Sequence, residues 1–399
     1  MEYKKGSVLE GIKVIDLGQV IAAPLSATIL ADMGADVIKV EMPGKGDNCR
    51  ASLPMRDGVS TYFIAFNCGK RGMTLNLKSE KGKEVLTRMI KEADVLIENF
   101  RPGVLAKLGF SYEQLKAINP RMIYAAVSGF GQEGPYSHRA GYDPVAQAMS
   151  GIMSVTGQPD SQPVRCGASF ADVMAAQNTV VGILAALHYR ERTGMGQMVD
   201  VSLADCCISA LASINQVYLT HGTVPQRLGN TYAASAPGNN YPTSDGQIIL
   251  LSGNEVQWQK LCHILGHEEW VSDADFIDNQ TRVLHKQRLD DCIRKETVRF
   301  TTDELMGLMM EAGLAAAPIN NIQQTVEDPH FRDVRGMYPE VMDPQLGAIR
   351  VTNQPVKMSA AMPYVRGPAP MLGQHTDEIL KSLGYSDDDI KEMKETGAI

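Results

Sequence analysis

Ile12-Lys-Val-Ile-Asp-Leu-Gly18 and Asp36-Val-Ile-Lys-Val-Glu41 are two short segments rich in β-branched residues, and both are typical of buried strands. Between them, Pro24 to Gly34 is apolar and alanine-rich, and it is predicted to be a helix. A strand, a helix and a second strand in this order predict a βαβ unit, in which the two strands run parallel.

The same alternation continues beyond this unit. The further predicted elements are helix Glu80 to Ala93, strand Val95 to Phe100, helix Tyr112 to Ile118 and strand Met122 to Ser128. Ser111 and Gln114 have the spacing of a capping box at the start of the second of these helices. We therefore expect an open α/β fold with a mostly parallel sheet, covered by helices on both faces.

Ligands of such sheets bind beyond the carboxyl ends of the strands. The loops expected at that edge are Gly18 to Pro24, Met42 to Asp47, Phe100 to Gly103 and Gly129 to Tyr142. Basic residues on or near this edge are Lys70, Arg71, Lys78, Arg101, Lys107 and Arg139. They suit a phosphate-rich ligand, but solvated surface charge is an equally good interpretation.

A second informative stretch is Cys166-Gly-Ala-Ser-Phe-Ala-Asp172, which leads into the apolar segment Val173 to Tyr189. This pattern predicts a loop that enters a buried helix, with Asp172 at or near the N-cap. The helix dipole and free N–H groups would lower the pKa of this carboxyl and keep it ionised. Such a carboxylate can serve as a nucleophile, although an ordinary capping aspartate is the commoner case.

The composition and the hydrophobic pattern of the sequence change at Gly222, which indicates a second part of the chain. Strand Val199 to Leu203 and helix Ala204 to His221 continue the α/β pattern, and Gly222 to Asn240 then has the composition of a linker. The elements predicted after it are strand Gln247 to Ser252, helix Val256 to Leu265, a charged helix from about Thr281 to Phe300, and helix Asp303 to Gly313 capped by Thr302. This block is predicted to form a second, smaller domain.

Composition limits the class of protein. The formal net charge of -8 argues against a nucleic-acid partner held by bulk electrostatics. The start of the chain lacks the apolar core of a signal peptide, and runs such as Val180 to Leu187 are too short to span a membrane, so we expect a cytoplasmic protein. The seven scattered cysteines indicate reduced thiols rather than a disulfide framework.

Two motifs give only weak evidence for a nucleotide or a metal site. Gly129-Phe-Gly131-Gln-Glu-Gly134 has the GxGxxG spacing, but Pro135 follows where a dinucleotide-binding fold needs a helix to open. His263 and His267 have a metal-ligand spacing, but a glycine lies between them, and surface or core histidines are the commoner case. We therefore expect neither a metal nor a tightly bound cofactor.

Many segments in order carry a resemblance to a known family. They are Leu9 to Asp16, Gly34 to Glu41, Asn67 to Arg71, Leu75 to Lys78, Ala93 to Phe100, Ser128 to Gly131, Gly141 to Asp143, Gly182 to Leu187, Thr193 to Gln197 and Gly373 to Thr376. The chain closely resembles the class III (family III) CoA-transferases of the formyl-CoA transferase type, whose superfamily also contains α-methylacyl-CoA racemases. The resemblance implies a Rossmann-like large domain from residues 1–221 and 326–399, a linker and small domain at 222–325, and an interlocked homodimer.

The resemblance also implies a site. Asp172 matches the catalytic aspartate of the family. The implied CoA contacts are Val20, Ile21, Ala22, Leu75, Lys78, Asn99, Phe100, Arg101 and Lys107, with Arg139 and Tyr142 near the thioester. Two positions depart from the formyl-CoA transferase pattern: Met42 stands where an arginine stacks on adenine, and Ala234 to Tyr241 lacks the glycine run of the loop that shields the thioester.

The implied reaction moves CoA from an acyl-CoA to a free carboxylic acid through covalent intermediates on Asp172, with the CoA thioester as a substrate. The alternative within the superfamily is a 2-methylacyl-CoA racemase, which pairs an aspartate with a histidine where this chain has Tyr142. Tyrosine, with a reference pKa of about 10, is a poor base near neutral pH, and this favours transfer. A third interpretation is a non-enzymatic acyl-CoA-binding protein.

Overall fold

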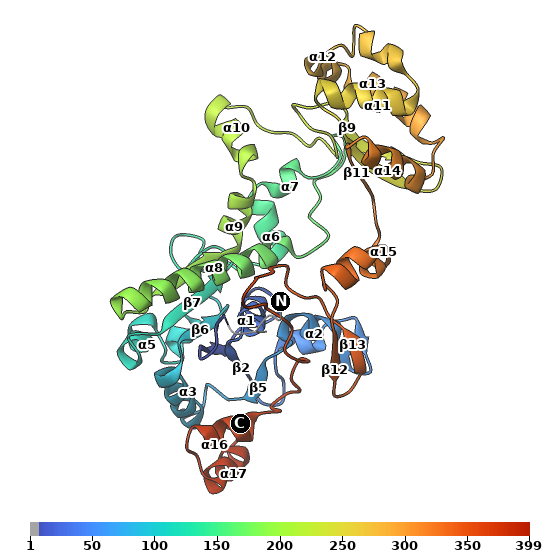
Figure 1. Cartoon of the computed structure of the whole chain (residues 1–399). Helices are drawn as coiled ribbons and strands as arrows, with labels where there is room; N and C mark the ends of the chain where they lie inside the picture. The colour runs from blue at the N-terminus through green and yellow to red at the C-terminus, as the bar shows by residue number, and fades with distance from the viewer. Residues whose placement is uncertain (1–7) are drawn as a thin grey trace. The chain divides into compact units, whose positions relative to one another are not determined.

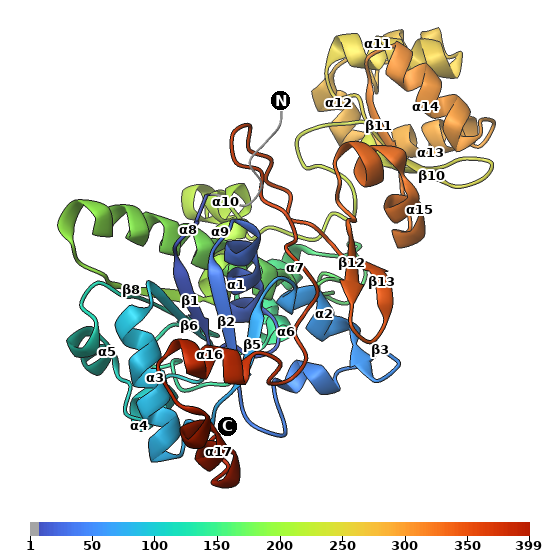
Figure 2. The same cartoon turned by 60° about the horizontal axis from the view of Figure 1, so that its bottom comes forward.

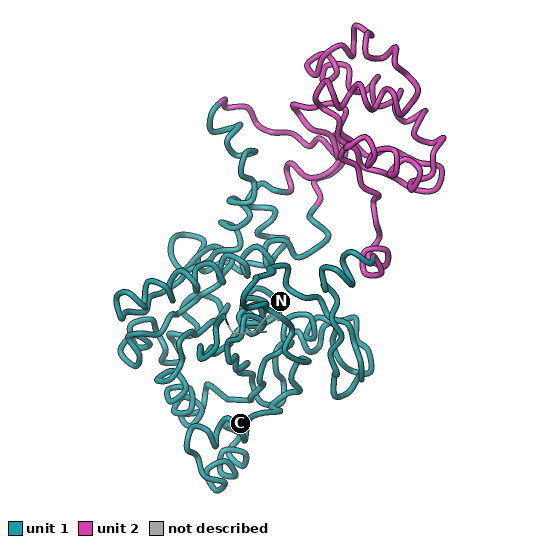
Figure 3. Tube along the Cα trace, viewed as in Figure 1, with its two compact units in different colours: residues 1–152, 165–220, 329–399 teal, residues 153–164, 221–328 magenta. Residues whose placement is uncertain are grey.

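The computed structural model describes residues 8–399, which divide into two compact units (Figure 3). Of the described residues, unit 1 contains 8–152, 165–220 and 329–399, and unit 2 contains 153–164 and 221–328. Unit 1 is thus assembled from three separate segments of the chain.

Unit 1 is built on a six-stranded parallel sheet (Figures 1 and 2). Its strands, in spatial order, are β5 (Arg71–Thr74), β2 (Asp36–Glu41), β1 (Lys13–Asp16), β6 (Val95–Glu98), β7 (Ile123–Ser128) and β8 (Met198–Ser202). Each neighbouring pair is parallel. This confirms the predicted open α/β fold, although the sequence analysis did not identify β5.

Alternate residues of each strand enter two separate cores. Val14 and Val95 belong to the core shared with α1 (Ala22–Asp32) and α8 (Phe170–Thr193), whereas Ile15 and Leu96 point to the opposite face. That second face is covered by α3 (Glu80–Glu92), α5 (Tyr112–Ile118), α16 (Thr376–Ser382) and α17 (Asp387–Glu395). The period-two alternation of side chains explains why the strands are apolar on both sides.

The order of the strands creates a topological switch point between β1 and β6. From β1 the chain proceeds outward through β2 to β5, then returns to the other side of β1 and proceeds through β6, β7 and β8. The connections that follow β1 and β6 therefore diverge at the boundary between these two neighbours. Such a topological switch point opens a crevice at the carboxyl ends of the strands.

The remaining elements of unit 1 are short. They are the 3₁₀ helix η1 (Asn48–Ala51), the strand pair β3 (Met55–Arg56) and β4 (Val59–Ser60), α2 (Thr61–Asn67), α4 (Val104–Lys107), α6 (Asp143–Met149), α9 (Leu203–Ala210), α10 (Ser213–His221), the π-helix η3 (His330–Val334), and the strand pair β12 (Glu340–Asp343) and β13 (Gly347–Arg350). Helix α7 (Ile152–Val155) crosses the boundary between the units, as does the last residue of α10, His221. The predicted capping box of α5 is confirmed, because Ser111 and Gln114 exchange both hydrogen bonds.

Unit 2 is a small α/β unit with its own core. Its antiparallel sheet has the order β11 (Ala315–Pro318), β10 (Gln247–Leu251) and β9 (Gly238–Pro242). The helices are α11 (Glu255–Leu265), η2 (Glu268–Ser272), α12 (Asn279–Leu284), α13 (Lys286–Thr297), α14 (Thr302–Glu311) and α15 (Ile322–Glu327). Trp258 and Phe276 are fully buried between these layers.

Several predicted boundaries were wrong for local reasons. The helix expected from Ala204 to His221 is two helices, interrupted where Ala212 takes a positive φ of 40°. The charged helix from Thr281 is also divided, at His285. Thr301, not Thr302, caps α14, because its hydroxyl accepts the Glu304 N–H. Strand β9 lies at the end of the stretch predicted to be a linker.

Candidate active site

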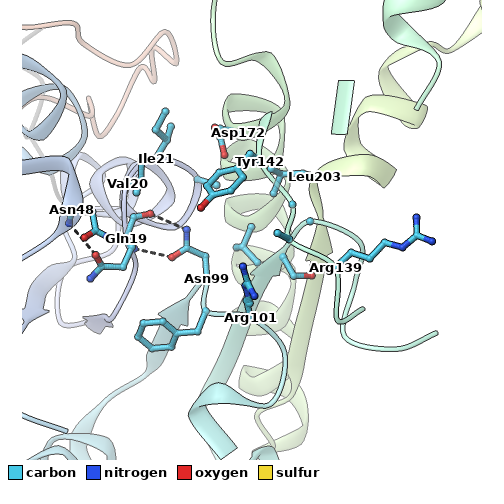
Figure 4. A pocket seen from close by; sticks show the side chains of 17 residues that line it. Gln19, Val20, Ile21, Asn48, Asn99, Arg101, Arg139, Tyr142, Asp172 and Leu203 are labelled. Atoms are coloured by element: carbon cyan, nitrogen blue, oxygen red, sulfur yellow. Dashed lines mark hydrogen bonds between the residues drawn. The ribbon is translucent and has the colours of Figure 1, made fainter. Parts of the chain in front are cut away.

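A pocket of about 220 Å³ opens at the switch point of unit 1 (Figure 4). The residues that line it are Gln19, Val20, Ile21, Ala22, Asn48, Asn99, Phe100, Arg101, Val127, Ser128, Gly129, Arg139, Ala140, Gly141, Tyr142, Asp172 and Leu203. They come from the end of β7, from the segments that follow β1, β2, β6 and β7, and from the start of α8 and α9. The position agrees with the sheet edge that the sequence predicted for a ligand.

The loops after β1, β2 and β6 are joined at Gln19. The Asn99 amide accepts the Gln19 N–H at 2.7 Å and donates to the Gln19 carbonyl at 2.8 Å. On the other side, the Gln19 side-chain oxygen accepts the Asn48 N–H at 3.2 Å (Figure 4). These bonds fix one wall of the pocket without using any group from unit 2.

The loop after β7 is fixed by two glycines that touch. A Cβ on Gly129 would lie 2.5 Å from the Cα of Gly141, and a Cβ on Gly141 would lie 2.2 Å from the Cα of Gly129. Both distances are far inside van der Waals contact, so only glycine fits at either position. The close approach places Arg139 and Tyr142 on the pocket wall (Figure 4).

Asp172 reaches the pocket from the first turn of α8. The N-cap residue is Ser169, whose side chain makes no capping hydrogen bond. Capping comes instead from buried Asp143, whose carboxylate accepts the Ala171 N–H at 2.7 Å and the Gln147 amide at 2.7 Å. Asp172 is therefore near the N-cap, as predicted, but the capping bond to this turn is made by another aspartate.

The predicted electrostatics of Asp172 were wrong. Burial, together with the negative charge of Asp143, raises the pKa of Asp172 to about 7. The expected lowering by the helix N-terminus is outweighed, because the carboxyl is desolvated and faces a second carboxylate. A carboxyl that titrates near neutral pH inside a pocket is characteristic of a catalytic group.

The structure brings most of the predicted site residues together. Nine of them line the pocket: Val20, Ile21, Ala22, Asn99, Phe100, Arg101, Arg139, Tyr142 and Asp172. Leu75, Lys78 and Lys107 do not: Leu75 is buried in the core, whereas Lys78 and Lys107 are exposed. Leu75 and Lys78 nevertheless follow β5, and Lys107 lies in α4 after β6, so both groups belong to chain segments that leave the same sheet edge.

Some basic residues suggested by the sequence are already occupied. Lys70 is buried, and its Nζ lies 2.8 Å from an Asp16 carboxylate oxygen. Arg71 pairs with Asp36 at 2.6 Å and with Glu378 at 3.1 Å. These two cations are structural, and the interpretation of them as phosphate-binding residues was wrong.

Other candidate chemistries gain no support from the structure. The loop after Gly134 stays irregular until α6 begins at Asp143, so no helix opens under the glycine motif as a dinucleotide site requires. His263 is exposed and pairs with Glu268 at 2.9 Å. Among residues 8–399 no group of three or more metal-ligating side chains comes together.

Sequence reasoning missed three polar residues of the site. Gln19, Asn48 and Asp143 act through hydrogen bonds to neighbouring loops, and no spacing rule identifies such contacts before the loops are folded. Asp143 gave one signal, because it follows Gly141 and Tyr142 in a segment that carries the family resemblance.

Comparisons with known proteins agree with this geometry. The model of the family described as CoA-transferase family III matches residues 9–376. The succinate–glutarate CoA-transferase of Agrobacterium fabrum is 40% identical, covering 94% of this chain and 95% of that protein. The succinyl-CoA–D-citramalate CoA-transferase of Chloroflexus aurantiacus is 37% identical, covering 96% of each chain. The crystal structure of a CaiB/BaiF family protein from Brucella suis has a TM-score of 0.87 at 38% identity, covering 96% of this chain and all of that chain.

An open α/β unit with a carboxylate in a pocket at its switch point is typical of ligand-binding enzymes. The similar proteins described above show which family of such enzymes this chain belongs to. The chain belongs to CoA-transferase family III. The protein is therefore a CoA-transferase that uses CoA thioesters as substrates. The resemblance stated from the sequence is confirmed.

Proposed function

We propose that the protein moves CoA from an acyl-CoA donor to a free carboxylic acid through covalent intermediates on Asp172. One observation carries the proposal. Among the described residues that line the pocket, Asp172 is the only carboxylic acid, and the lining includes no cysteine, histidine or lysine. In a pocket of this composition, Asp172 is the best available nucleophile.

The reaction proceeds in balanced steps. The Asp172 carboxylate attacks the thioester carbonyl of the donor, the C–S bond breaks, and an aspartyl-acyl anhydride and CoA thiolate form. The thiolate attacks the aspartyl carbonyl, which releases the donor acid and leaves aspartyl-CoA. The acceptor carboxylate displaces the thiolate to give a second anhydride, and the thiolate then attacks the acceptor carbonyl. The products are acceptor-CoA and free Asp172.

The surrounding residues support this assignment. Arg101 is an exposed cation on the pocket wall, and it suits the phosphates of CoA or a second carboxylate of the acid. Arg139 also lines the pocket, but its guanidinium lies 3.9 Å from the centroid of the Tyr136 ring and is directed away from the pocket (Figure 4). We place the pantetheine and acyl group against Val20, Ile21, Ala22, Asn99, Phe100 and Tyr142, and we place the distal part of CoA along Leu75, Lys78 and Lys107 at the same sheet edge. No tightly bound cofactor takes part in these steps.

The relatives suggest the substrate class. The names of the two relatives compared above refer to succinate, glutarate and D-citramalate, which are dicarboxylic acids. We therefore propose that the donor is the CoA thioester of a short dicarboxylic acid and that the acceptor is a short dicarboxylic acid. A panel of donor thioesters and acceptor acids, with products identified by mass spectrometry, tests this. Equal turnover of monocarboxylic acids of the same length contradicts it.

Trapping tests the covalent mechanism. The enzyme is mixed with donor acyl-CoA, quenched with hydroxylamine or borohydride, and digested for peptide mass spectrometry. We expect the modification on Asp172 and no transfer in Asp172→Ala. Asp200→Asn is a control, because Asp200 is an exposed aspartate in the middle of β8 that does not line the pocket. An adduct elsewhere, or full activity in Asp172→Ala, refutes the proposal.

The alternative function, 2-methylacyl-CoA racemisation, needs two acid/base groups on opposite faces of the α-carbon. The pocket offers one carboxyl and Tyr142, which is 67% exposed. In deuterated water with a 2-methylacyl-CoA and no acceptor acid, we expect no α-deuterium. Deuterium uptake without an acceptor supports the racemase, and absence of turnover with every donor and acceptor supports a binding protein.

We further propose that the active form is a homodimer, which the family resemblance suggests is interlocked. Helix α10 has no buried residue, and its apolar side chains Ile214, Val217, Tyr218 and Leu219 are all exposed. Helix α8 is long and apolar enough to cross a membrane by length and composition alone, yet part of it is buried in the core of unit 1. Its exposed Val181 and Tyr189 suit a protein partner better than water.

Sedimentation velocity tests the dimer. We expect twice the chain mass for the wild type and a shift toward monomer in Leu219→Asp. Val256→Asp is the control, because Val256 has similar exposure in unit 2. A monomeric wild type refutes the proposal. We also propose a cytoplasmic location, which is supported by seven cysteines that are all free thiols.

A further inference from the structure

Val20 has an unusual backbone conformation at the wall of the pocket. Its φ is +65°, and it is one of three non-glycine residues with positive φ among the described residues. A β-branched residue is strongly disfavoured there, because its side chain clashes with its own backbone. Such strain persists only where neighbouring groups hold the backbone in place.

The carboxylate of Asp47 holds this backbone. The Val20 N–H donates to both Asp47 oxygens, at 3.0 Å and 3.3 Å. Asp47 also accepts the Cys49 N–H at 2.9 Å, which caps η1, so the carboxylate is fixed to the loop after β2. One carboxylate thus ties the loop after β2 to the loop after β1.

Lys39 supports Asp47 from β2. Its Nζ lies 2.7 Å from an Asp47 oxygen and donates to the Gly18 carbonyl at 2.6 Å. Both side chains have no solvent exposure. Lys39 therefore binds the residue that holds Val20 and also the loop two residues before Val20.

The pair belongs to a larger buried cluster with balanced charge. Asp16 accepts the Gly18 N–H at 2.8 Å and pairs with Lys70 at 2.8 Å. Glu41 accepts the Asp47 N–H at 2.8 Å and pairs with Arg50 at 2.7 Å. Three acids thus face three bases, so removal of one charge leaves an uncompensated charge in the cluster.

We propose that Asp47, supported by Lys39, is a positioning residue for CoA transfer: it holds Val20 in the left-handed conformation that keeps Gln19 to Ala22 on the pocket wall. Asp47 does not line the pocket; it acts through its hydrogen bonds to the Val20 backbone and to η1, whose first residue Asn48 also lines the pocket. The inference rests on the proposed function in one respect, namely that this pocket binds the substrate.

The inference makes a quantitative prediction. Asp47→Asn keeps the shape of the side chain but removes the charge that attracts Lys39. Without that anchor, we expect Val20 to relax from positive φ and the loop to shift. Misplacement of a site wall by about 1 Å can cost about 100-fold, so we expect kcat/KM to fall about 10- to 100-fold.

A double-mutant cycle tests the role of Val20. Glycine adopts positive φ without strain, so Val20→Gly removes the need for an anchor. The activity of Val20→Gly is measured first and serves as a new reference. We expect Asp47→Asn to lower kcat/KM by less than about 5-fold in this background, against the larger fall in the wild type. A merely structural Asp47 gives equal falls in both backgrounds, and that result overturns the proposal.

Two further measurements make the result unambiguous. Asp32→Asn is the matched control, because Asp32 is a buried acid of unit 1 outside the pocket, and we expect it to alter unfolding without lowering kcat/KM. If Asp47→Asn does not fold, Lys39→Arg is tested in the same two backgrounds with the same expectation. The trapped adduct is mapped in parallel: an adduct on Asp172 with no rescue by Val20→Gly refutes only this inference, whereas an adduct elsewhere refutes the proposed function.

Discussion

Asp143 lies close to Asp172 at the start of α8, and its negative charge acts on the Asp172 carboxyl. Asp143 is buried and accepts the Ala171 N–H at 2.7 Å, so it stays at a fixed position next to the residue that lines the pocket. Burial first, and the charge of Asp143 second, raise the pKa of Asp172 to about 7. The acid that caps the helix therefore also tunes the proposed nucleophile.

The first prediction concerns pH. Because only the ionised carboxyl is a nucleophile, we expect kcat/KM to rise with pH through about 7 and then to level off. In Asp143→Asn one negative charge is removed, so the pKa of Asp172 falls and the rising limb moves to lower pH. Because burial is the larger cause of the raised pKa of Asp172, we expect Asp143→Asn to reverse only the smaller part of that rise. An unchanged limb, or one that moves to higher pH, contradicts the coupling.

The second prediction concerns stability. A carboxyl whose pKa is raised on folding stabilises the folded state at low pH, and this contribution is lost as pH rises from about 4 toward 7. Asp172→Asn removes the cost of burying the charge, so we expect it to stabilise unit 1 by about 1–3 kcal/mol at pH 8. Urea denaturation at pH 8 and pH 4 checks this, and the gain should shrink at pH 4. Asp160→Asn, at an exposed aspartate of unit 2, is the control for exchanging an aspartate for an asparagine.

The third prediction concerns the two glycines that touch. We expect Gly141→Ala to push the Arg139 to Tyr142 loop away from Gly129 and to lower kcat/KM by about 10- to 100-fold. Gly307→Ala is the control: Gly307 lies within α14 with nothing near its Cβ position, so alanine should raise stability by about 0.5–1 kcal/mol without affecting transfer. Wild-type kinetics in Gly141→Ala would show that the close approach is dispensable.

The fourth prediction separates the basic residues. Arg101 lines the pocket, whereas Lys107 lies outside it in α4. We expect Arg101→Gln to raise KM for acyl-CoA about 10-fold at low salt, through loss of a charge-assisted contact, and Lys107→Gln to raise it less. Steady-state kinetics at two salt concentrations measure both. An Arg71→Gln variant, which affects a cation paired with Asp36 and Glu378, should leave KM unchanged.

The fold was largely predictable because its signals are local. Each of the apolar strands, around Val14, Val37 and Ile97, is one uninterrupted stretch of sequence, and the capping box at Ser111 needs only four residues. Strand β5 was missed because Arg71 to Thr74 is short and begins with a charged residue. Helices were predicted across Ala212 and His285 because an interruption of one or two residues hardly changes the apolar pattern.

The sequence by itself determined the parallel α/β architecture, the sheet edge where a ligand is expected and the candidacy of Asp172. These follow from periodicity, from the order of strands and helices, and from residues that match a family. Only the tertiary structure decided the ionisation of Asp172, the removal of Lys70 and Arg71 from the site, and the hold of Asp47 on Val20. Those properties depend on burial and on distances between residues far apart in the chain, which no local pattern encodes.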